Sequence, residues 1–211
     1  MPDPLDPTAQ IILDAAESLF ARQGFAATTV KQLGARAGVT PALLYYYFRD
    51  KDGLYEAVLE RILGQLAGAA GERLGTAPSP QQAVRSIVAL QAEILTARPD
   101  AARLILRELV DHEARHAGPV ASAFVTTAFR GLCDAIRAGQ AAGHFRRDLR
   151  PEHAALSTIA QVVYAFLARP LFLSQLGDGS GLAGPDALRE FGAHAADFAV
   201  AALAATREPA R

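Results

Sequence analysis

The stretch of sequence that decides the fold lies near the N-terminus and reads Gly38-Val39-Thr40-Pro41-Ala42-Leu43-Leu44-Tyr45-Tyr46-Tyr47-Phe48-Arg49-Asp50-Lys51. Thr40 followed by Pro41 is typical of a helix start, because the hydroxyl caps free N–H groups and proline fits the first helical position. Gly38 can adopt the left-handed conformation that ends a preceding helix. The stretch therefore predicts a tight turn between two short helices.

The faces of the second short helix differ in character. Ala42, Tyr45 and Tyr46 have i, i+3 and i+4 spacing and share one face, whereas Leu44 and Phe48 lie on another face that can dock on a core. Three consecutive tyrosines are costly to bury together, because each hydroxyl needs a hydrogen-bond partner. An exposed tyrosine face with a lysine just beyond the helix predicts a surface that meets a polar, anionic partner, and nucleic acid is the leading candidate.

The residues before this stretch predict two more helices. Asp6 followed by a proline is typical of a helix start, and Gly24 is a natural stop. Thr29 and Gln32 match a capping box at the start of the second helix, which then runs to Gly38. Helix, glycine-containing turn and short helix together predict a helix-turn-helix. The alternative from this pattern alone is an ordinary helical hairpin whose tyrosines coat the surface.

Between Thr8 and Leu59 several residue groups occur in a distinctive order. They are Ile12-Leu13-Asp14-Ala15-Ala16, Leu19-Phe20, Gly24-Phe25, Thr28-Thr29-Val30, Ala35-Arg36-Ala37-Gly38-Val39, Leu44-Tyr45-Tyr46-Tyr47-Phe48 and Lys51. In this combination the sequence resembles the tetracycline-repressor (TetR) family.

The resemblance implies an all-α fold. Residues 1–52 are expected to form a three-helix, helix-turn-helix DNA-binding domain, and residues 53–211 a larger helical domain for effector binding and dimerisation, with about nine helices in all. By motif position, Tyr45, Tyr46 and Lys51 match family positions that contact DNA. The full predicted DNA-binding set is Thr29, Lys31, Thr40, Pro41, Ala42, Tyr45, Tyr46, Tyr47 and Lys51.

Composition limits the other classes of protein. The 211 residues carry a net charge of −1, and hydrophobic residues make up 51% of them, much of it alanine, which favours helices. The expected DNA-binding domain is not basic overall, so its net charge alone would not identify it as a nucleic-acid-binding domain. We expect no membrane-spanning run, no signal peptide and a cytoplasmic protein.

Few residues suggest chemistry. His112, Glu113 and His116 have a spacing that can hold a metal, but the nearby Gly118 predicts a fraying helix end, so solvated side chains are the favoured interpretation. Cys133 lies among apolar residues and is expected to be a small core residue. No nucleophile-elbow serine and no phosphate-binding glycine pattern is present. We therefore expect no enzyme, no cofactor and no metal.

The second half of the chain is expected to bind a ligand and a second copy. The aromatic side chains of this half fill the core in the default interpretation. Polar groups among these apolar neighbours, together with the effector that the family resemblance implies, instead indicate a pocket that contains Gln91, Arg107, Phe124, Phe129, Gln161, Tyr164 and Phe166. The last two helices are expected to form a homodimer through Val163, Phe166, Phe191 and Phe198; the alternative is that both are core helices of a monomer.

Two functions follow from these expectations. The first is a dimeric, sequence-specific transcriptional repressor that binds double-stranded operator DNA and is released by a small apolar or aromatic ligand. The second is a ligand-independent DNA-binding architectural or interaction protein with the same fold. The sequence identifies neither the effector nor the operator.

Overall fold

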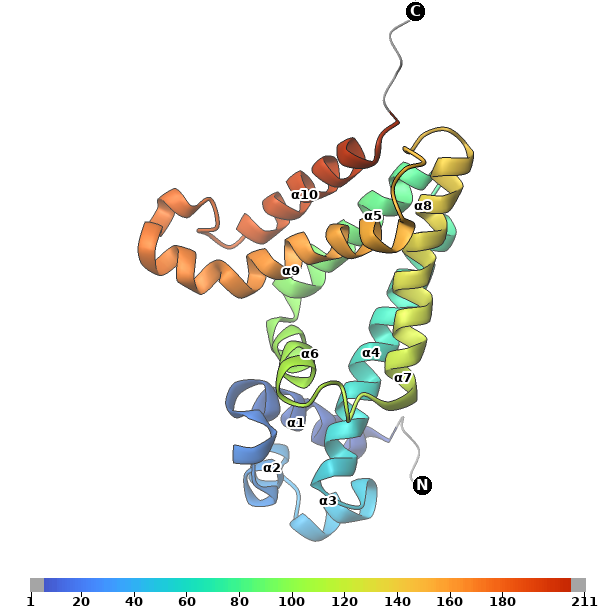
Figure 1. Cartoon of the computed structure of the whole chain (residues 1–211). Coiled ribbons are helices and arrows are strands. Elements are labelled where there is room, and N and C mark those ends of the chain that lie inside the picture. Colours follow the sequence, from blue (N-terminus) through green and yellow to red (C-terminus); the bar gives the residue numbers. More distant parts are fainter. Residues whose placement is uncertain (1–5, 206–211) are drawn as a thin grey trace, which may run out of the picture. The chain divides into compact units, whose positions relative to one another are not determined.

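The computed structural model describes residues 6–205, except for the side chains of Pro119 and Val120. Its elements are α1 (Pro7–Ala27), α2 (Val30–Ala37), α3 (Pro41–Phe48), α4 (Lys51–Thr76), α5 (Pro80–Ala97), α6 (Pro99–Asp111), α7 (Gly118–Phe124), the π-helical segment η1 (Val125–Arg130), α8 (Gly131–Ala141), α9 (Pro151–Leu176), the 3₁₀ segment η2 (Gly177–Ser180) and α10 (Ala187–Leu203). In the described range no strand forms beyond an isolated bridge between Phe145 and Ala204. The predicted all-α class is confirmed (Figure 1).

The chain divides into two compact units. The first contains the described part of Met1–Leu66 together with Arg98–Ala123, and the second contains Ala67–Ala97 and the described part of Phe124–Arg211. Helix α6 therefore belongs to the first unit, where it packs against α1. This division reflects packing and leaves the predicted functional boundary after residue 52 untested.

The helix ends of the first unit form as their sequence predicts. Asp6 Oδ1 accepts a hydrogen bond of 2.7 Å from the Thr8 N–H, and Gly24, with φ of 83°, interrupts α1 before its last turn. Thr29 and Gln32 form the complete capping box of α2. Gly38 ends α2 in the left-handed conformation, with φ of 69°.

The turn between α2 and α3 depends on a second glycine. A Cβ atom at Gly34 would lie 2.8 Å from the carbonyl oxygen of Val39, so a side chain at this position would push the turn apart. Beyond the turn, the Thr40 hydroxyl accepts a hydrogen bond of 3.3 Å from the Leu43 N–H and caps α3. The helix-turn-helix is thus determined by local sequence at both ends.

Helix α3 is held on the first unit by its inner face. Leu44 is fully buried, as are Leu33 of α2 and Leu54 of α4. Phe20 and Tyr55 meet edge to face with their ring centroids 5.1 Å apart. Each large side chain removed from water contributes about 1.5–3 kcal/mol, so a few such residues fix α3 in the unit.

The second unit has a core of its own around Leu132, Ile136 and Phe145, onto which parts of α5, α8, α9 and α10 pack (Figure 1). Two glycines permit close approach there. A Cβ at Gly139 would lie 2.2 Å from the Phe145 ring, and a Cβ at Gly192 of α10 would lie 2.4 Å from Ala92 of α5. The small residues of α10 thus pack closely within this chain.

Helix α9 is long and apolar. Pro170 lies inside it, and the helix continues to Leu176. Also, the segment Pro151–Ser180 is long and apolar enough to cross a membrane by length and composition alone, with a mean hydropathy of 1.5. A single helix that passes this test is weak evidence for a membrane span, so the expectation that the chain does not cross a membrane stays a prediction. Only 17% of the apolar window is buried, so much of this surface is uncovered in the single chain.

Candidate nucleic-acid interface

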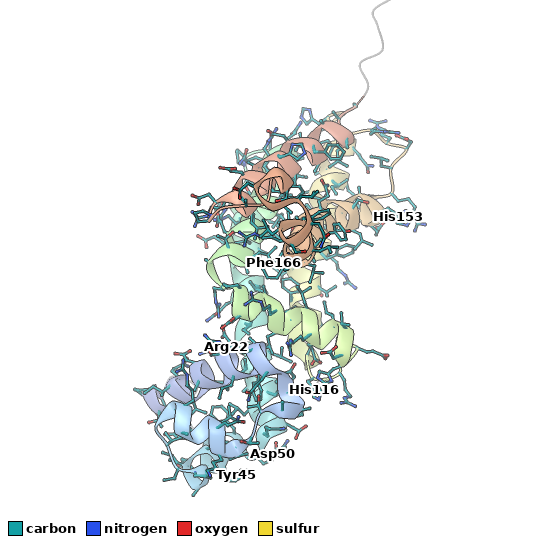
Figure 2. All side chains as sticks on the ribbon, turned by 90° about the vertical axis from the view of Figure 1, so that its left-hand side faces the viewer. Arg22, Tyr45, Asp50, His116, His153 and Phe166 are labelled. Carbon is teal, nitrogen blue, oxygen red and sulfur yellow. The ribbon has the colours of Figure 1, made fainter. Side chains whose placement is uncertain are left out.

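The outer face of α3 carries five of the predicted DNA-binding residues. Tyr46 is 70% exposed and Tyr45 is 47% exposed, although both are large and partly apolar. Thr40, Pro41 and Ala42 are exposed beside them at the start of the helix. Figure 2 shows the labelled Tyr45 at the outer end of the first unit. These residues form one continuous surface, which we call the α3 face.

Tyr47 differs from its two neighbours. Its ring is partly buried and meets Tyr46 edge to face at 5.3 Å, and its hydroxyl donates a hydrogen bond of 2.9 Å to Asp6 Oδ2. The hydroxyl is thus already used within the protein. Tyr47 therefore supports α3 from behind, and its assignment as a DNA contact stays a prediction.

Thr29 and Lys31 lie at the start of α2, and both are exposed. The Thr29 hydroxyl takes part in the capping box, where it accepts a hydrogen bond of 3.3 Å from the Gln32 N–H. Lys31 is a solvent-exposed cation two residues after this cap. A helix N-terminus with an exposed lysine suits phosphate oxygens, because free N–H groups and positive charge both favour anions.

Lys51 is more engaged than its sequence position suggests. Its ammonium group donates hydrogen bonds to the carbonyl oxygens of Phe25 at 3.0 Å and Thr28 at 3.1 Å. The same group lies 4.2 Å from the centre of the Phe25 ring. Lysine has three N–H donors, so one remains for an outside acceptor. The residue therefore stabilises the turn between α1 and α2, and its assignment as a DNA contact stays a prediction.

Arg49 is a cation that our predicted set left out. It ends α3 with a left-handed backbone, φ of 62°, and its side chain is exposed. Its guanidinium pairs with Asp50 at 2.9 Å. The Gly53 N–H and this guanidinium together lower the pKa of the Asp50 carboxyl. Asp50 thus neutralises part of the charge next to the α3 face, and the only sequence signal for Arg49 was its position after the helix.

Two family models match the chain. The model of bacterial regulatory proteins of the tetR family matches residues 12–58, and the model of the tetracyclin repressor-like C-terminal domain matches residues 80–198. The chain belongs to the TetR family.

Individual TetR-family proteins agree with this assignment. The transcriptional repressor NicS of Pseudomonas putida is 31% identical over 163 residues, which are 76% of each chain. The structure of the ketosteroid regulator KstR2 of Mycobacterium tuberculosis superposes with a TM-score of 0.75 at 16% identity and covers 96% of this chain and 97% of its own. The structure of FadR of Bacillus subtilis, solved with stearoyl-CoA, superposes with a TM-score of 0.72 at 15% identity. The match covers 92% of this chain and 99% of the FadR chain.

These findings confirm the predicted class of function. The family consists of DNA-binding transcriptional regulators, and two of the relatives, NicS and KstR2, are named repressors. The predicted N-terminal helix-turn-helix domain followed by a helical C-terminal domain is confirmed as well.

The predicted effector-pocket residues occupy several environments. Phe124 and Phe129 pack against the core of the second unit, and Phe166 packs in a smaller cluster with Phe172 and Phe191. Arg107 belongs to the first unit, whereas the other predicted residues belong to the second.

The polar members of that predicted set also differ in exposure. Tyr164 is 65% exposed. Gln161 lines a surface pocket of about 550 Å³ together with Phe198 and neighbouring residues of α9 and α10. Gln91 donates a hydrogen bond of 3.0 Å to the Ile159 carbonyl, and its own Oε1 is buried with no hydrogen-bond partner among the described residues. The pocket assignment stays a prediction.

The predicted dimer residues separate into two groups. Phe198 is 58% exposed on α10. Val163, Phe166 and Phe191 are half-buried, and the two phenylalanines pack on a cluster of their own chain. Phe198 is therefore the member of the set that is most available to a second copy.

The expected chemistry of the histidine segment needs correction. We expected solvated side chains at a fraying end, but the His116 side chain is only 8% exposed and its Nδ1 lies 3.2 Å from Oε2 of the buried Glu108. Glu113, which we had grouped with the histidines, is exposed, and Glu108 takes its place. Cys133 is buried as expected, and burial raises the pKa of its thiol.

Proposed function

We propose that this protein is a cytoplasmic, homodimeric repressor that binds double-stranded operator DNA through residues 1–52. Residues 53–211 hold a small apolar or aromatic effector and the partner copy. Binding of the effector lowers the affinity for the operator. Family membership supports the general scheme, and the following observations support its parts.

The observation that carries the DNA-binding part is the exposure of the α3 face. A soluble protein gains nothing in stability from two exposed tyrosines on one short helix, whereas phenol hydroxyls donate well to phosphate oxygens and bases. The face is also rigid, because Leu44 and the Tyr47–Asp6 hydrogen bond hold α3 from behind. A rigid polar-aromatic face next to Lys31 and Lys51 suits the major groove and its flanking phosphates.

The dimer is supported by the uncovered side of α9. Leu156, Tyr164, Leu167 and Leu171 are all exposed and recur at spacings of three or four residues or multiples of these, so they form one stripe. Exposed apolar stripes of this kind mark surfaces that another protein covers. A second copy of the chain, with Phe198 of α10 at the same contact, covers the stripe through a two-fold interface.

The apolar effector is supported by the character of the second unit. Its interior is lined by aliphatic and aromatic side chains, and the unpaired Oε1 of Gln91 offers one buried acceptor for orienting a ligand. A regulator of similar fold, FadR of Bacillus subtilis, was solved with stearoyl-CoA, and another is named for ketosteroids. We therefore propose a ligand with an extended apolar part.

The test is selection of bound sequences from random DNA duplexes, followed by gel-shift titration on the selected operator. We expect an enriched two-fold symmetric motif and weaker binding by Tyr46→Phe. Ser122→Ala is the control, because it removes an exposed hydroxyl from α7, outside the α3 face and the proposed dimer stripe, and should bind the operator as the parent does. Failure to enrich any motif, or equal binding by all three proteins, contradicts the proposal.

A further inference from the structure

Three side chains with metal-ligating atoms converge where α6 ends. Glu108 lies in the last turns of the helix, and His112 and His116 follow it. Two consecutive residues, Glu113 and Ala114, have left-handed backbones with φ of 53° and 61°, and the Ala114 N–H donates to the Glu108 carbonyl at 3.0 Å. Such conformations are unfavourable for residues other than glycine, so the surrounding structure holds this curl in place.

The spacing of the ligating atoms fits a small coordination sphere. One carboxylate oxygen of Glu108 and one ring nitrogen from each of His112 and His116 lie within 4.8 Å of one another. His116 Nδ1 and Glu108 Oε2 are 3.2 Å apart. A tetrahedral site with bonds of about 2.0–2.1 Å places its ligands about 3.3 Å apart. The distance between His116 Nδ1 and Glu108 Oε2 therefore already matches the separation of two ligands in such a site.

The carboxylate is also oriented for this role. Its other oxygen, Glu108 Oε1, accepts a hydrogen bond of 2.7 Å from the backbone N–H of His116. That bond fixes the carboxylate while Oε2 faces the histidine ring. The side chain of Glu108 is only 3% exposed, and a side-chain hydrogen bond with Tyr55 also holds the carboxylate in place.

The surroundings favour a cation from the solvent side. The His112 and His116 rings meet edge to face at 4.9 Å, and the rings of Phe25 and Tyr55 pack against His116 at 5.7 and 5.2 Å. His112 also lines a surface pocket of about 520 Å³, together with Asp111, Glu113 and Arg115. Two carboxylates and one guanidinium give the pocket a net negative field.

We propose that Glu108, His112 and His116 bind one divalent transition-metal ion, with Zn²⁺ as the best-fitting probe. The two imidazoles are borderline ligands, and with one carboxylate they form a set that suits Zn²⁺, Co²⁺ and Ni²⁺ better than Mg²⁺ or Ca²⁺. Three protein ligands leave the fourth position of a tetrahedral ion to water. This inference replaces our expectation of no metal, and it stands apart from the proposed repressor function.

The ion also affects the first unit. Both histidine rings pack against Phe25 of α1 and Tyr55 of α4, the two helices that flank α2 and α3. A ligand that binds only the folded state stabilises that state by mass action. Zn²⁺ should therefore raise the unfolding temperature of the first unit. Above the dissociation constant, this increase should grow with the logarithm of the Zn²⁺ concentration.

The test uses the full chain without an affinity tag, stripped of metal and titrated with Zn²⁺ by calorimetry. Co²⁺ serves as a spectroscopic probe, because low-symmetry tetrahedral Co²⁺ absorbs strongly in the visible range. We expect one ion per chain. His112→Ala and His116→Gln should each weaken binding at least about 100-fold, since loss of an outer-shell partner alone costs about 10–100-fold.

The variants are chosen so that the fold survives. His112→Ala leaves the Glu108–His116 pair intact, and the amide of His116→Gln can still donate to Glu108. His153→Ala is the matched control, because His153 is exposed on α9 and belongs to the second unit (Figure 2). Absence of stoichiometric binding, or equal affinity in the parent and both ligand variants, overturns the site. Neither result bears on operator binding, because no DNA is present.

Discussion

The hydroxyl of Tyr47 donates a hydrogen bond of 2.9 Å to Asp6 Oδ2 and joins the last turn of α3 to the residue that caps α1. The other oxygen of the same carboxylate accepts from the Thr8 N–H at 2.7 Å. One aspartate thus serves two elements of the first unit. The position of the exposed Tyr45 and Tyr46 depends on this contact, because it fixes the rotation of α3.

Acid should weaken this contact. The Thr8 N–H and the Tyr47 hydroxyl lower the pKa of Asp6 from its ordinary value of 3.8. A carboxyl with a lowered folded-state pKa contributes stability above the unfolded value and loses it as the pH falls through the folded value. We expect Asp6→Asn to reduce the loss of stability below about pH 4. Urea unfolding of the parent and the variant at neutral and acid pH measures the free energy of unfolding that decides this.

Asparagine removes the titrating carboxyl but keeps a side-chain oxygen that can still cap α1, so parent and variant differ mainly in the charge of residue 6. At neutral pH the variant should be slightly less stable than the parent, and the difference should shrink in acid. A parent and variant that lose stability in parallel down to about pH 2 would show that Asp6 does not carry this pH dependence.

Local chemistry explains what the sequence predicted well. The capping box at Thr29, the left-handed Gly38 and the cap at Thr40 each involve residues within a few positions of one another. Such signals do not depend on tertiary structure. They predicted the helix-turn-helix, and with it the exposed face that contains Tyr45 and Tyr46.

Contacts between distant residues explain what the sequence missed. Lys51 donates to carbonyls of Phe25 and Thr28, more than twenty residues earlier, and no local pattern predicts this. Glu108 replaces Glu113 beside His116 because the chain curls through left-handed backbones at residues other than glycine. A helical extrapolation of the spacing therefore selected the wrong carboxylate.

Loss of single polar groups from the α3 face, or of the neighbouring Lys51 charge, should weaken operator binding. Tyr45→Phe and Tyr46→Phe should each cost about 1 kcal/mol of binding free energy, the net value of one hydrogen bond. Lys51→Met keeps the aliphatic stem over Phe25 and removes the charge. It should lower both the affinity and its salt dependence. Gel-shift titration at two salt concentrations measures both effects.

Tyr47→Phe serves as the internal comparison, because its hydroxyl is bonded to Asp6 rather than exposed. We expect it to lower the unfolding temperature more than it lowers operator affinity. If Tyr45→Phe, Tyr46→Phe and Lys51→Met all bind as the parent does, the α3 face is not the DNA-binding surface.

Sequence discrimination by α3 should be modest and weighted toward thymine. No arginine, lysine, asparagine or glutamine occurs between Thr40 and Phe48, so the bidentate contacts to guanine or adenine are absent from this helix. Thr40 and Ala42 are exposed and can contact thymine methyl groups. Groove shape and half-site spacing should supply the remaining specificity. Invariant G·C pairs under α3 in selected operators would contradict this prediction.

Phe198→Glu should dissociate the dimer while the helices remain folded. Phe198 is 58% exposed in the single chain, so the substitution harms no intramolecular core, but a charge in a covered interface costs several kcal/mol. Val110→Glu is the matched control, because Val110 is similarly apolar and 79% exposed but lies on α6. Sedimentation should show a monomer for the first variant only, with unchanged helical circular dichroism. A dimeric Phe198→Glu would place the interface elsewhere.

The last prediction concerns release from the operator. Effector and DNA can influence each other only if each binds one of two conformations better than the other. Helix α4 runs from Lys51 to Thr76 and contributes residues to both units, so we expect it to transmit the change. Gly64 and Gly68 lie along it, and each lowers helix stability by about 1 kcal/mol relative to alanine. Bending near these glycines is therefore cheap.

We expect an effector to weaken operator binding by about 5–150-fold, the usual range of coupling free energies. Operator DNA must then weaken effector binding by the same factor, and calorimetry with and without operator measures this directly. The double variant Gly64→Ala, Gly68→Ala introduces no steric clash, because nothing lies within 4 Å of either added Cβ. It should stiffen α4 and reduce the coupling while leaving both separate affinities near their parent values. Equal coupling in the parent and the double variant would exclude bending at these glycines as the route.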